Sequence, residues 1–220
     1  MSGLKDILRE TGLKDTRPAT KKIERYLDLL YRERKIRNII GPRNRETIFR
    51  EHFIPSLCLG AEIEGGRGAD IGTGAGIPGM VIAIVNPSCP VILMEPKKSR
   101  VNFLNKVKND LGLENVTVAV LRGEEAGRRK EYREQFRFVT CRAVASLKVS
   151  SELAMPLLKT GGIYYAQKGE KLSAELKEAQ SIIDILGGEI EDIKADNTLI
   201  IRKVSSTPEN YPRKWNRIKK

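Results

Sequence analysis

The stretch ADIGTGAGIPGM, residues 69–80, decides the fold of this 220-residue chain. Its last three glycines fit G-x-G-x-x-G, which is typical of a dinucleotide-binding turn between a strand and a helix. Its first three glycines fit a second pattern, acid-x-G-x-G-x-G, in which Asp70 is the acid. Both patterns predict a short strand, a glycine turn and a helix N-terminus, where backbone N–H groups meet a ligand. The four glycines are Gly72, Gly74, Gly76 and Gly79.

Asp70 separates the two ligands that such a turn can hold. A dinucleotide would place its pyrophosphate beside the turn, and a carboxylate two residues before the first glycine would repel it. S-adenosylmethionine presents an ammonium and a sulfonium, which an ionised Asp70 attracts directly or through water. Asp70 therefore favours a methyltransferase over an NAD-dependent oxidoreductase.

Two more acids follow predicted strands. Glu95 ends the strand VILME, 23 residues after Gly72, and an acid at about that distance accepts hydrogen bonds from ribose hydroxyls. Both cofactors contain such a ribose, so Glu95 supports an adenosine ligand without choosing between them. Glu124 follows the next strand in the segment LRGEE, where it can accept the adenine amino hydrogen. Three acids at successive strand ends are stronger evidence for an adenosine-containing ligand than each acid alone.

Outward from the glycine turn, short strands alternate with helices. This alternation predicts an α/β fold with a mostly parallel, doubly wound seven-stranded sheet, whose ligands lie at the carboxyl ends of the strands. Two consecutive strands at the end predict a terminal antiparallel hairpin. The predicted strands are 69–72, 91–95, 116–121, 136–145, 162–168, 189–195 and 198–204, the predicted helices are 78–86, 98–111, 151–158 and 172–186, and residues 124–135 form a charged helix or loop.

Two helices are predicted before the sheet. One covers about residues 20–38, where four apolar residues fall on one stripe at helical spacing and Lys and Arg cover the remaining face. The other covers about residues 45–59. The apolar stripe consists of Ile23, Tyr26, Leu27 and Leu30.

Charge is distributed unevenly along the chain, whose formal net charge is +12. Residues 1–50 hold 14 Lys and Arg against 7 Asp and Glu, residues 202–220 hold 7 against 1, and the middle is nearly neutral. Basic ends suit a polyanion such as RNA, because phosphates attract cations whatever the base sequence. We therefore divide the chain into a basic helical extension (1–60), a core (61–204) and a basic tail (205–220).

Several classes of protein are excluded. The longest unbroken apolar run, MVIAIV, is far shorter than the roughly 20 residues that span a bilayer. The N-terminus has charges where a signal peptide would be apolar, so we expect a cytoplasmic protein. Three scattered cysteines and one histidine do not form a zinc ligand set, so we expect no metal and reduced thiols.

Further stretches make the sequence resemble a known family, the small-subunit ribosomal RNA methyltransferase G family, also called glucose-inhibited division protein B. The resemblance extends from about Ile48 to the end of the chain. Extension of the glycine turn by Ile77-Pro78-Gly79 makes it specific. The matching stretches are DIGTGAGIPG, EPKKSRVNFL, RGEE, CRAVASL, PLLKTGG with QKG after it, and YPRKWNRIKK.

The resemblance implies a class I S-adenosylmethionine-dependent methyltransferase with a Rossmann-like fold, and N7 of one guanine in 16S rRNA as the methyl acceptor. It implies a general class role for Glu95 at the ribose. The other cofactor contacts that it implies are Gly72, Ile77, Gly123, Glu124 and Arg142.

The departures from the family pattern touch none of the acids or glycines. Cys141 stands where the family usually has serine, Ile77 replaces a more usual Phe or Leu, and Pro55 stands where an aspartate is common. The tail also lacks the Pro-Leu often seen after its last lysines. These departures bear on the RNA contacts rather than on the cofactor.

The residues after the fourth strand bear on the methyl acceptor. An exocyclic amine would favour an N/D-P-P-Y/F/W motif there, and the chain has CRAVASL instead. A pyrimidine C5 needs a cysteine nucleophile, but no Pro-Cys motif accompanies Cys141, which we predict to be a small buried thiol. Guanine N7 has an unprotonated lone pair and needs alignment rather than a base. We predict a positioning mechanism, with Arg142 as a candidate contact to the methionine carboxylate.

We expect the basic ends to grip RNA phosphates around the target. Lys168, after the fifth strand, can face phosphate or solvent, and the tail offers further cations at Arg213, Lys214 and Arg217. The expected partner is 16S rRNA, or the small ribosomal subunit or its precursor, bound by a monomer. The basic ends argue against a small-molecule methyltransferase. An RNA-binding protein with the same fold but no catalytic activity stays an alternative, which only an assay of methyl transfer distinguishes from a methyltransferase.

Overall fold

The computed structural model describes residues 16–37, 39–41, 44–169 and 171–218. The chain divides into two compact units. The first draws on the ranges Met1–Gly65 and Thr73–Val120, and the second on Gly66–Gly72 and Leu121–Lys220. The division cuts the glycine turn after Gly72, so each unit holds part of it. The predicted boundaries at residues 60 and 204 follow composition and stay a prediction.

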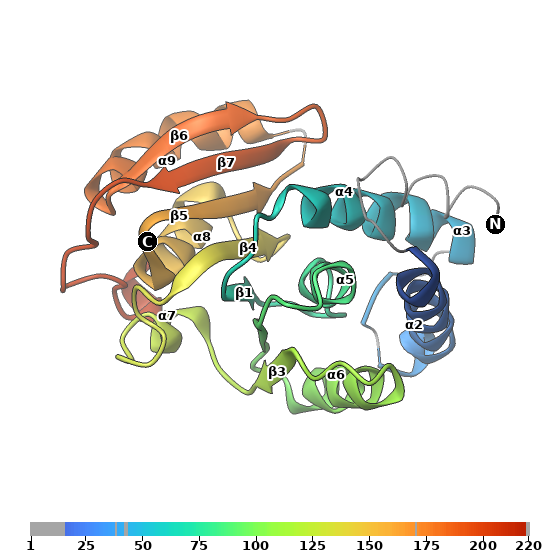
Figure 1. The fold of residues 1–220 in the computed structure, drawn as a ribbon. Coiled ribbons are helices and arrows are strands. Elements are labelled where there is room, and N and C mark those ends of the chain that lie inside the picture. The colour runs from blue at the N-terminus through green and yellow to red at the C-terminus, as the bar shows by residue number, and fades with distance from the viewer. Residues whose placement is uncertain (1–15, 38, 42–43, 170, 219–220) are drawn as a thin grey trace. The chain divides into compact units, whose positions relative to one another are not determined.

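Seven strands form the sheet. They are β1 (Gly68–Ile71), β2 (Val91–Met94), β3 (Val116–Ala119), β4 (Phe136–Arg142), β5 (Leu158–Gln167), β6 (Gly188–Ile193) and β7 (Thr198–Lys203). Their order is β3-β2-β1-β4-β5-β7-β6 (Figure 1). The pairs β2–β3, β1–β4 and β4–β5 are parallel, and the pairs β5–β7 and β6–β7 are antiparallel. The predicted mostly parallel sheet with a terminal antiparallel hairpin is confirmed.

The strand order reverses between β1 and β4, which both belong to the second unit. After β1 the order runs outward to β3, and β4 then continues on the other side of β1. In sheets of this kind, ligands bind at the carboxyl ends of the strands next to such a switch point.

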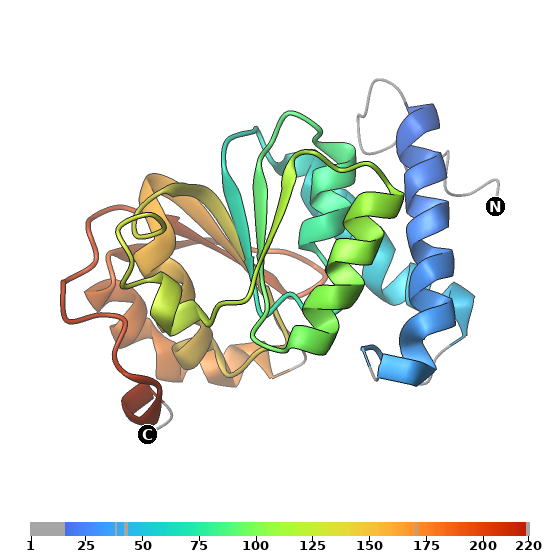
Figure 2. The same ribbon diagram turned by 90° about the horizontal axis from the view of Figure 1, so that it is seen from below.

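The first helix of the first unit buries its predicted apolar stripe: all four residues of the stripe are buried. Two ion pairs join this helix, α2 (Thr16–Arg37), to α6 (Lys98–Asp110). Arg25 Nη2 lies 2.7 Å from Asp110 Oδ1, and Lys106 Nζ lies 2.5 Å from Glu33 Oε1. The two helices lie side by side (Figures 1 and 2). The helices are α2 (Thr16–Arg37), α3 (Arg45–Ile48), α4 (Ile54–Glu62), α5 (Gly79–Val85) and α6 (Lys98–Asp110).

The predicted single helix over residues 45–59 is wrong in its continuity. A π-helical turn, η1 (Phe49–Phe53), separates α3 from α4. Pro55, at the start of α4, has no N–H to donate to the preceding turn. The N–H of Ile54 instead reaches the carbonyl of Phe49, five residues back.

In the second unit, two predicted boundaries are wrong. The helix α8 (Leu147–Ala154) begins before the predicted helix over 151–158, and a 3-10 turn, η2 (Met155–Leu157), leads directly into β5. The strand therefore begins at Leu158 and passes through Gly161 and Gly162, a pair that looks like a turn in sequence. Gly161 has a φ of +81°, and this part of β5 faces the shift in register of β4. The remaining helices are α7 (Gly123–Ala126), α9 (Leu172–Ile185) and α10 (Trp215–Ile218).

Candidate active site

The carboxyl end of β1 carries a buried acid. Asp70 is 1% exposed and lies opposite Thr140 in the parallel pairing with β4. The Thr140 hydroxyl donates a hydrogen bond to Asp70 Oδ1 at 2.9 Å. Burying a carboxylate costs free energy that must be offset by its partners. The hydrogen bond from Thr140 offsets part of this cost, and it holds the carboxyl group at the switch point of the sheet.

The backbone after β1 requires glycine at Gly72 for two reasons. Its φ of +61° lies in the left-handed region, which favours glycine. A Cβ atom on Gly72 would also lie 2.7 Å from Val144 Cγ2, so the loop after β4 packs directly against Gly72. A Cβ atom on Gly123 would lie 3.0 Å from Ile71 Cγ2. These approaches place the start of α7, with the buried Glu124, against the end of β1.

The carboxyl ends of β4 and β5 are level with each other, because Arg142 pairs with Gln167. Arg142 is half-buried at this edge. The Lys168 ammonium donates to the carbonyl of Ala145 at 2.6 Å and lies 3.1 Å from Glu175 Oε2. Its side chain is 7% exposed, so the fold itself already engages this cation.

The thiol of Cys141 is buried, which confirms the prediction of a small buried thiol. Burial raises the pKa of Cys141 to about 12, and the negative charge of Asp70 contributes to the rise. The thiol is therefore protonated at neutral pH, and it offers no thiolate for covalent attack.

In the first unit, Glu95 fixes the backbone of the glycine turn. Its Oε2 accepts the N–H of Gly74 at 3.1 Å, and its Oε1 accepts the N–H of Lys97 at 2.9 Å. Arg100 Nη1 lies 3.5 Å from the same carboxylate, which is 2% exposed. Each carboxylate oxygen has a second lone pair, so both can also accept a ligand hydroxyl.

A side chain from α2 also holds this turn. The Tyr26 hydroxyl donates to the carbonyl of Ala75 at 2.5 Å. A Cβ atom on Gly76 would lie 2.7 Å from the same hydroxyl oxygen, and Ile77 next to it is buried. The sequence shows Tyr26 only as part of an apolar stripe, so its polar role was missed.

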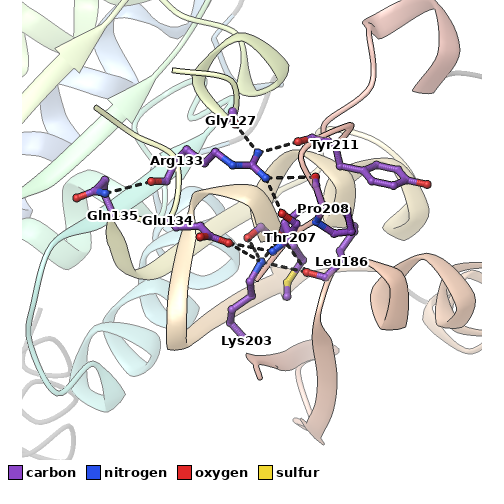
Figure 3. Close-up of polar contacts among 10 residues, drawn as sticks. Gly127, Arg133, Glu134, Gln135, Leu186, Lys203, Thr207, Pro208 and Tyr211 are labelled. Carbon is purple, nitrogen blue, oxygen red and sulfur yellow. Dashed lines mark hydrogen bonds and ion pairs between the residues drawn. The ribbon is translucent and has the colours of Figure 1, made fainter. Parts of the chain in front are cut away.

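Side chains of the second unit anchor the tail (Figure 3). The guanidinium of Arg133 donates to four carbonyl oxygens at 2.7–3.2 Å. Lys203 is fully buried and donates to two carbonyl oxygens at 2.9 and 3.0 Å, and to the hydroxyl of Thr207. The carbonyls bound by Arg133 belong to Gly127, Thr207, Pro208 and Tyr211, and those bound by Lys203 belong to Met155 and Leu186.

The three cations predicted in the tail differ in their surroundings. Arg213 Nη2 lies 2.6 Å from Oε2 of the fully buried Glu152, and its Nε donates to Oε1 at 2.9 Å. The side chain of Arg213 is 32% exposed. Lys214 and Arg217 are exposed. Arg213 therefore has a structural partner, whereas Lys214 and Arg217 face solvent.

Within the described ranges, no group of three His, Cys, Asp or Glu side chains is arranged to hold a metal ion. No helix in the same ranges has the length and apolarity needed to cross a membrane.

Comparison with known proteins gives consistent matches. A family model described as rRNA small subunit methyltransferase G matches residues 19–201. The ribosomal RNA small subunit methyltransferase G of Desulforamulus reducens is 38% identical over 223 residues, covering 96% of this chain and 93% of that protein. The protein of the same name from Desulfitobacterium hafniense is 40% identical over 198 residues, covering 86% of this chain and 83% of that protein.

A solved structure shares the fold at low sequence identity. The ribosomal protein L11 methylase of Lactobacillus delbrueckii subsp. bulgaricus superposes with a TM-score of 0.55 at 14% identity, covering 74% of this chain and 81% of that chain. At this identity the likeness concerns the fold alone.

Proposed function

The chain belongs to the ribosomal RNA small subunit methyltransferase G family of S-adenosylmethionine-dependent rRNA methyltransferases, and we propose that it methylates N7 of one guanine in 16S rRNA. The observation that carries the donor part of this proposal is the buried carboxylate of Asp70 at the switch point of the sheet, and the acceptor part rests on the family. A carboxylate there attracts the cationic donor and repels a pyrophosphate.

We propose cofactor contacts in both units. Those in the second unit are Asp70, Gly72, Gly123, Glu124 and Arg142. Those in the first unit are Gly74, Gly76, Ile77 and Glu95. The carboxylates suit the ammonium, the ribose hydroxyls and the adenine amino group, and the Arg142 guanidinium suits the methionine carboxylate.

The proposed mechanism is a direct displacement. S-adenosylmethionine, when bound, supplies a methyl group on a positively charged sulfur. Attack by the N7 lone pair forms the new N–C bond as the S–C bond breaks, so the sulfur becomes a neutral thioether and the positive charge passes to the guanine ring. No proton leaves N7, so the protein needs to align the atoms rather than supply a base. The protonated thiol of Cys141 is in keeping with a reaction that has no covalent enzyme intermediate.

The tail is the proposed RNA contact. Arg128 Nη2 donates to the carbonyl of Pro212 at 2.6 Å and so holds the tail, while Lys214 and Arg217 are exposed to a polyanion. Guanine N7 lies in the deep, narrow major groove of A-form RNA, so the target must lie in a loop or leave its stack. We propose that the active species is a monomer that meets 16S rRNA alone or in the small subunit.

One experiment tests the acceptor directly. The protein is incubated with radiolabelled S-adenosylmethionine and 16S rRNA as naked RNA, as small subunits and as whole ribosomes. The label is then mapped by chemical cleavage at N7-methylguanine. Label on an exocyclic amine or on a pyrimidine C5 carbon would overturn the mechanism, and wild-type protein that binds RNA and donor without transfer would indicate a non-catalytic RNA-binding protein.

A second experiment tests the donor contacts. Asp70→Asn keeps an oxygen that can accept from Thr140 but removes the charge, so we expect donor affinity to fall about tenfold or more by calorimetry. Arg142→Ala should also weaken the donor. Glu189→Gln, a charge change on the exposed side of β6, is the matched control. Equal donor affinity in Asp70→Asn and wild type would remove Asp70 from the donor site.

A further inference from the structure

We propose that Glu175 is a positioning residue for methyl transfer, because with Lys168 it clamps the loop at residues 143–146 against Gly72. This inference rests on the proposed function for its catalytic consequence. The clamp itself is a property of the fold and can be measured without activity.

Glu175 reaches the loop from α9. Its Oε2 accepts the N–H of Leu147, the first residue of α8, at 2.6 Å. The side chain of the N-cap residue Ser146 makes no capping hydrogen bond to this helix N-terminus, so the carboxylate of Glu175 caps the helix instead. A negative charge at this end of a helix is also favourable toward the helix dipole.

The same carboxylate oxygen lies 3.1 Å from the ammonium of Lys168. Lys168 in turn donates to the carbonyl of Ala145 at 2.6 Å. The loop is thus held at a carbonyl by the cation and at an N–H two residues later by the anion. The ion pair joins these two contacts into one clamp.

The loop needs a clamp because its conformation is strained. Ala143 has a φ of +52°, a left-handed conformation that a side chain disfavours. A single such residue persists where surrounding contacts fix the backbone on both sides. Arg142 fixes one side as the last residue of β4, and the Lys168–Glu175 pair fixes the other.

The position of the loop determines the space at the proposed donor site. Val144 lies so close to the glycine turn that a Cβ atom on Gly72 would approach it to 2.7 Å. Arg142, the proposed contact to the methionine carboxylate, immediately precedes the loop. Release of the clamp therefore frees the backbone of Val144, which packs against Gly72, and the backbone that follows Arg142.

Glu175→Ala is the main variant, and Glu178→Ala is its matched control. Glu178 lies one turn later on the same helix, is exposed, and gives the same change of charge. Glu175→Gln keeps an oxygen for the N–H of Leu147 but removes the attraction to Lys168. Lys168→Met, alone and combined with Glu175→Ala, tests whether the two side chains act as one unit.

The first measurement is hydrogen exchange by mass spectrometry. In Glu175→Ala we expect peptides covering residues 143–149 to exchange about fivefold faster or more than in wild type, with β4 and α9 peptides unchanged. Glu175→Gln should be intermediate, Glu178→Ala should match wild type, and the double variant should exchange no faster than the single ones. Unchanged exchange over residues 143–149 in Glu175→Ala would overturn the clamp.

The second measurement separates positioning from a merely structural role. For Glu175→Ala we expect kcat to fall about tenfold and donor affinity to fall about threefold or more, with the RNA KM within about twofold of wild type. Faster loop exchange with kcat and donor affinity equal to wild type would overturn the positioning role. If wild type transfers no methyl group, the proposed function fails, and donor affinity together with loop exchange still decides the role of Glu175.

Discussion

The loop at residues 143–146 and the part of the tail at residues 205–214 both lack regular secondary structure, and different kinds of side chain hold them. The loop is held by one ion pair, Lys168–Glu175, whose acid is partly exposed. The tail is held by buried or half-buried groups: Lys203, Arg133 and the pair of Arg213 with Glu152.

Because of this difference, we expect substitutions in the two regions to affect different properties of the protein. A fully buried carboxylate such as Glu152 costs several kilocalories per mole when it loses its partner. Glu175 is partly exposed, so water can solvate it when Lys168 is replaced, and the loss is smaller. We therefore expect changes at the tail anchors to lower the free energy of unfolding with little effect on the donor site. Changes at the loop should affect donor binding and transfer, with a smaller loss of stability than at the tail, because Lys168 keeps the carbonyl of Ala145 as a partner.

The largest expected effect is at the tail. Arg213→Ala removes the side chain that pairs with the fully buried Glu152. We expect the free energy of unfolding to fall by about 3 kcal/mol or more, because the buried carboxylate loses its ion pair. Urea unfolding measures the loss, and calorimetry of the folded variant should give wild-type donor affinity.

Arg217→Ala is the control for this variant, because Arg217 is exposed on α10 and its loss should change stability by less than about 0.5 kcal/mol. Similar stability for the two variants would show that the tail is not anchored through Glu152.

The second effect depends on pH. Burial lowers the pKa of Lys203 from 10.5 to about 8, and the nearby charge of Glu134 partly offsets this. Between these values the unfolded chain holds a proton that the folded chain has lost, so the contribution of Lys203 to stability rises from about pH 8 to about pH 10.5, by up to about 3 kcal/mol. Below about pH 8 both states are protonated and the contribution is constant.

Lys203→Met isolates this effect. Cys141 and Tyr164 act in the opposite direction at high pH, because burial raises the pKa of both groups, but they are the same in variant and wild type. The free energy of unfolding of wild type minus that of Lys203→Met should therefore increase between about pH 7.5 and about pH 10. A constant difference across this range would rule out a buried cation at the tail anchor.

The third effect is at the loop. Gly72→Ala adds a methyl group toward Val144 in a left-handed backbone, so donor affinity should fall about tenfold through displacement of the loop or the turn. Gly112→Ala is the matched control, because Gly112 has a φ of +57° and no atom within 4 Å of the added group. Equal donor affinity in both variants would show that the contact with the loop has no functional weight.

The smallest effect is expected at Cys141. Cys141→Ala should leave kcat within about twofold of wild type and the product as N7-methylguanine, because direct displacement uses no thiol. The free energy of unfolding should fall by about 1 kcal/mol, because the substitution leaves a small cavity. Loss of methyl transfer in a folded Cys141→Ala would contradict displacement without a covalent intermediate.

Much of this arrangement follows from the sequence, and the rest depends on contacts distant in sequence. The glycine turn and the alternating elements predict the sheet, and Asp70 stands out because it precedes the turn. Thr140, Tyr26 and Glu175 do not stand out, because their partners lie 70, 49 and 28 residues away. Each looks like an ordinary strand, core or surface residue until the fold brings its partner close.

The errors in element boundaries have local causes. The pair Gly161-Gly162 resembles a turn, but it lies inside β5 at a shift of register. Pro55 resembles an interior helix residue, but it stands at the start of α4, directly after the π-helical turn. In both cases backbone hydrogen bonding, rather than the apolar pattern, sets where the element begins or ends.

The burial of Cys141 has a consequence for an enzyme that handles an alkylating reagent. Because burial raises the pKa of Cys141 to about 12, the group stays a thiol at pH 7. A thiolate at the end of β4 would compete with guanine as a methyl acceptor, and its methylation would inactivate the protein. Burial is the main cause of the raised pKa of this thiol, and the negative charge of Asp70 adds to it. Iodoacetamide should accordingly label the exposed Cys58 and spare Cys141 in the folded protein.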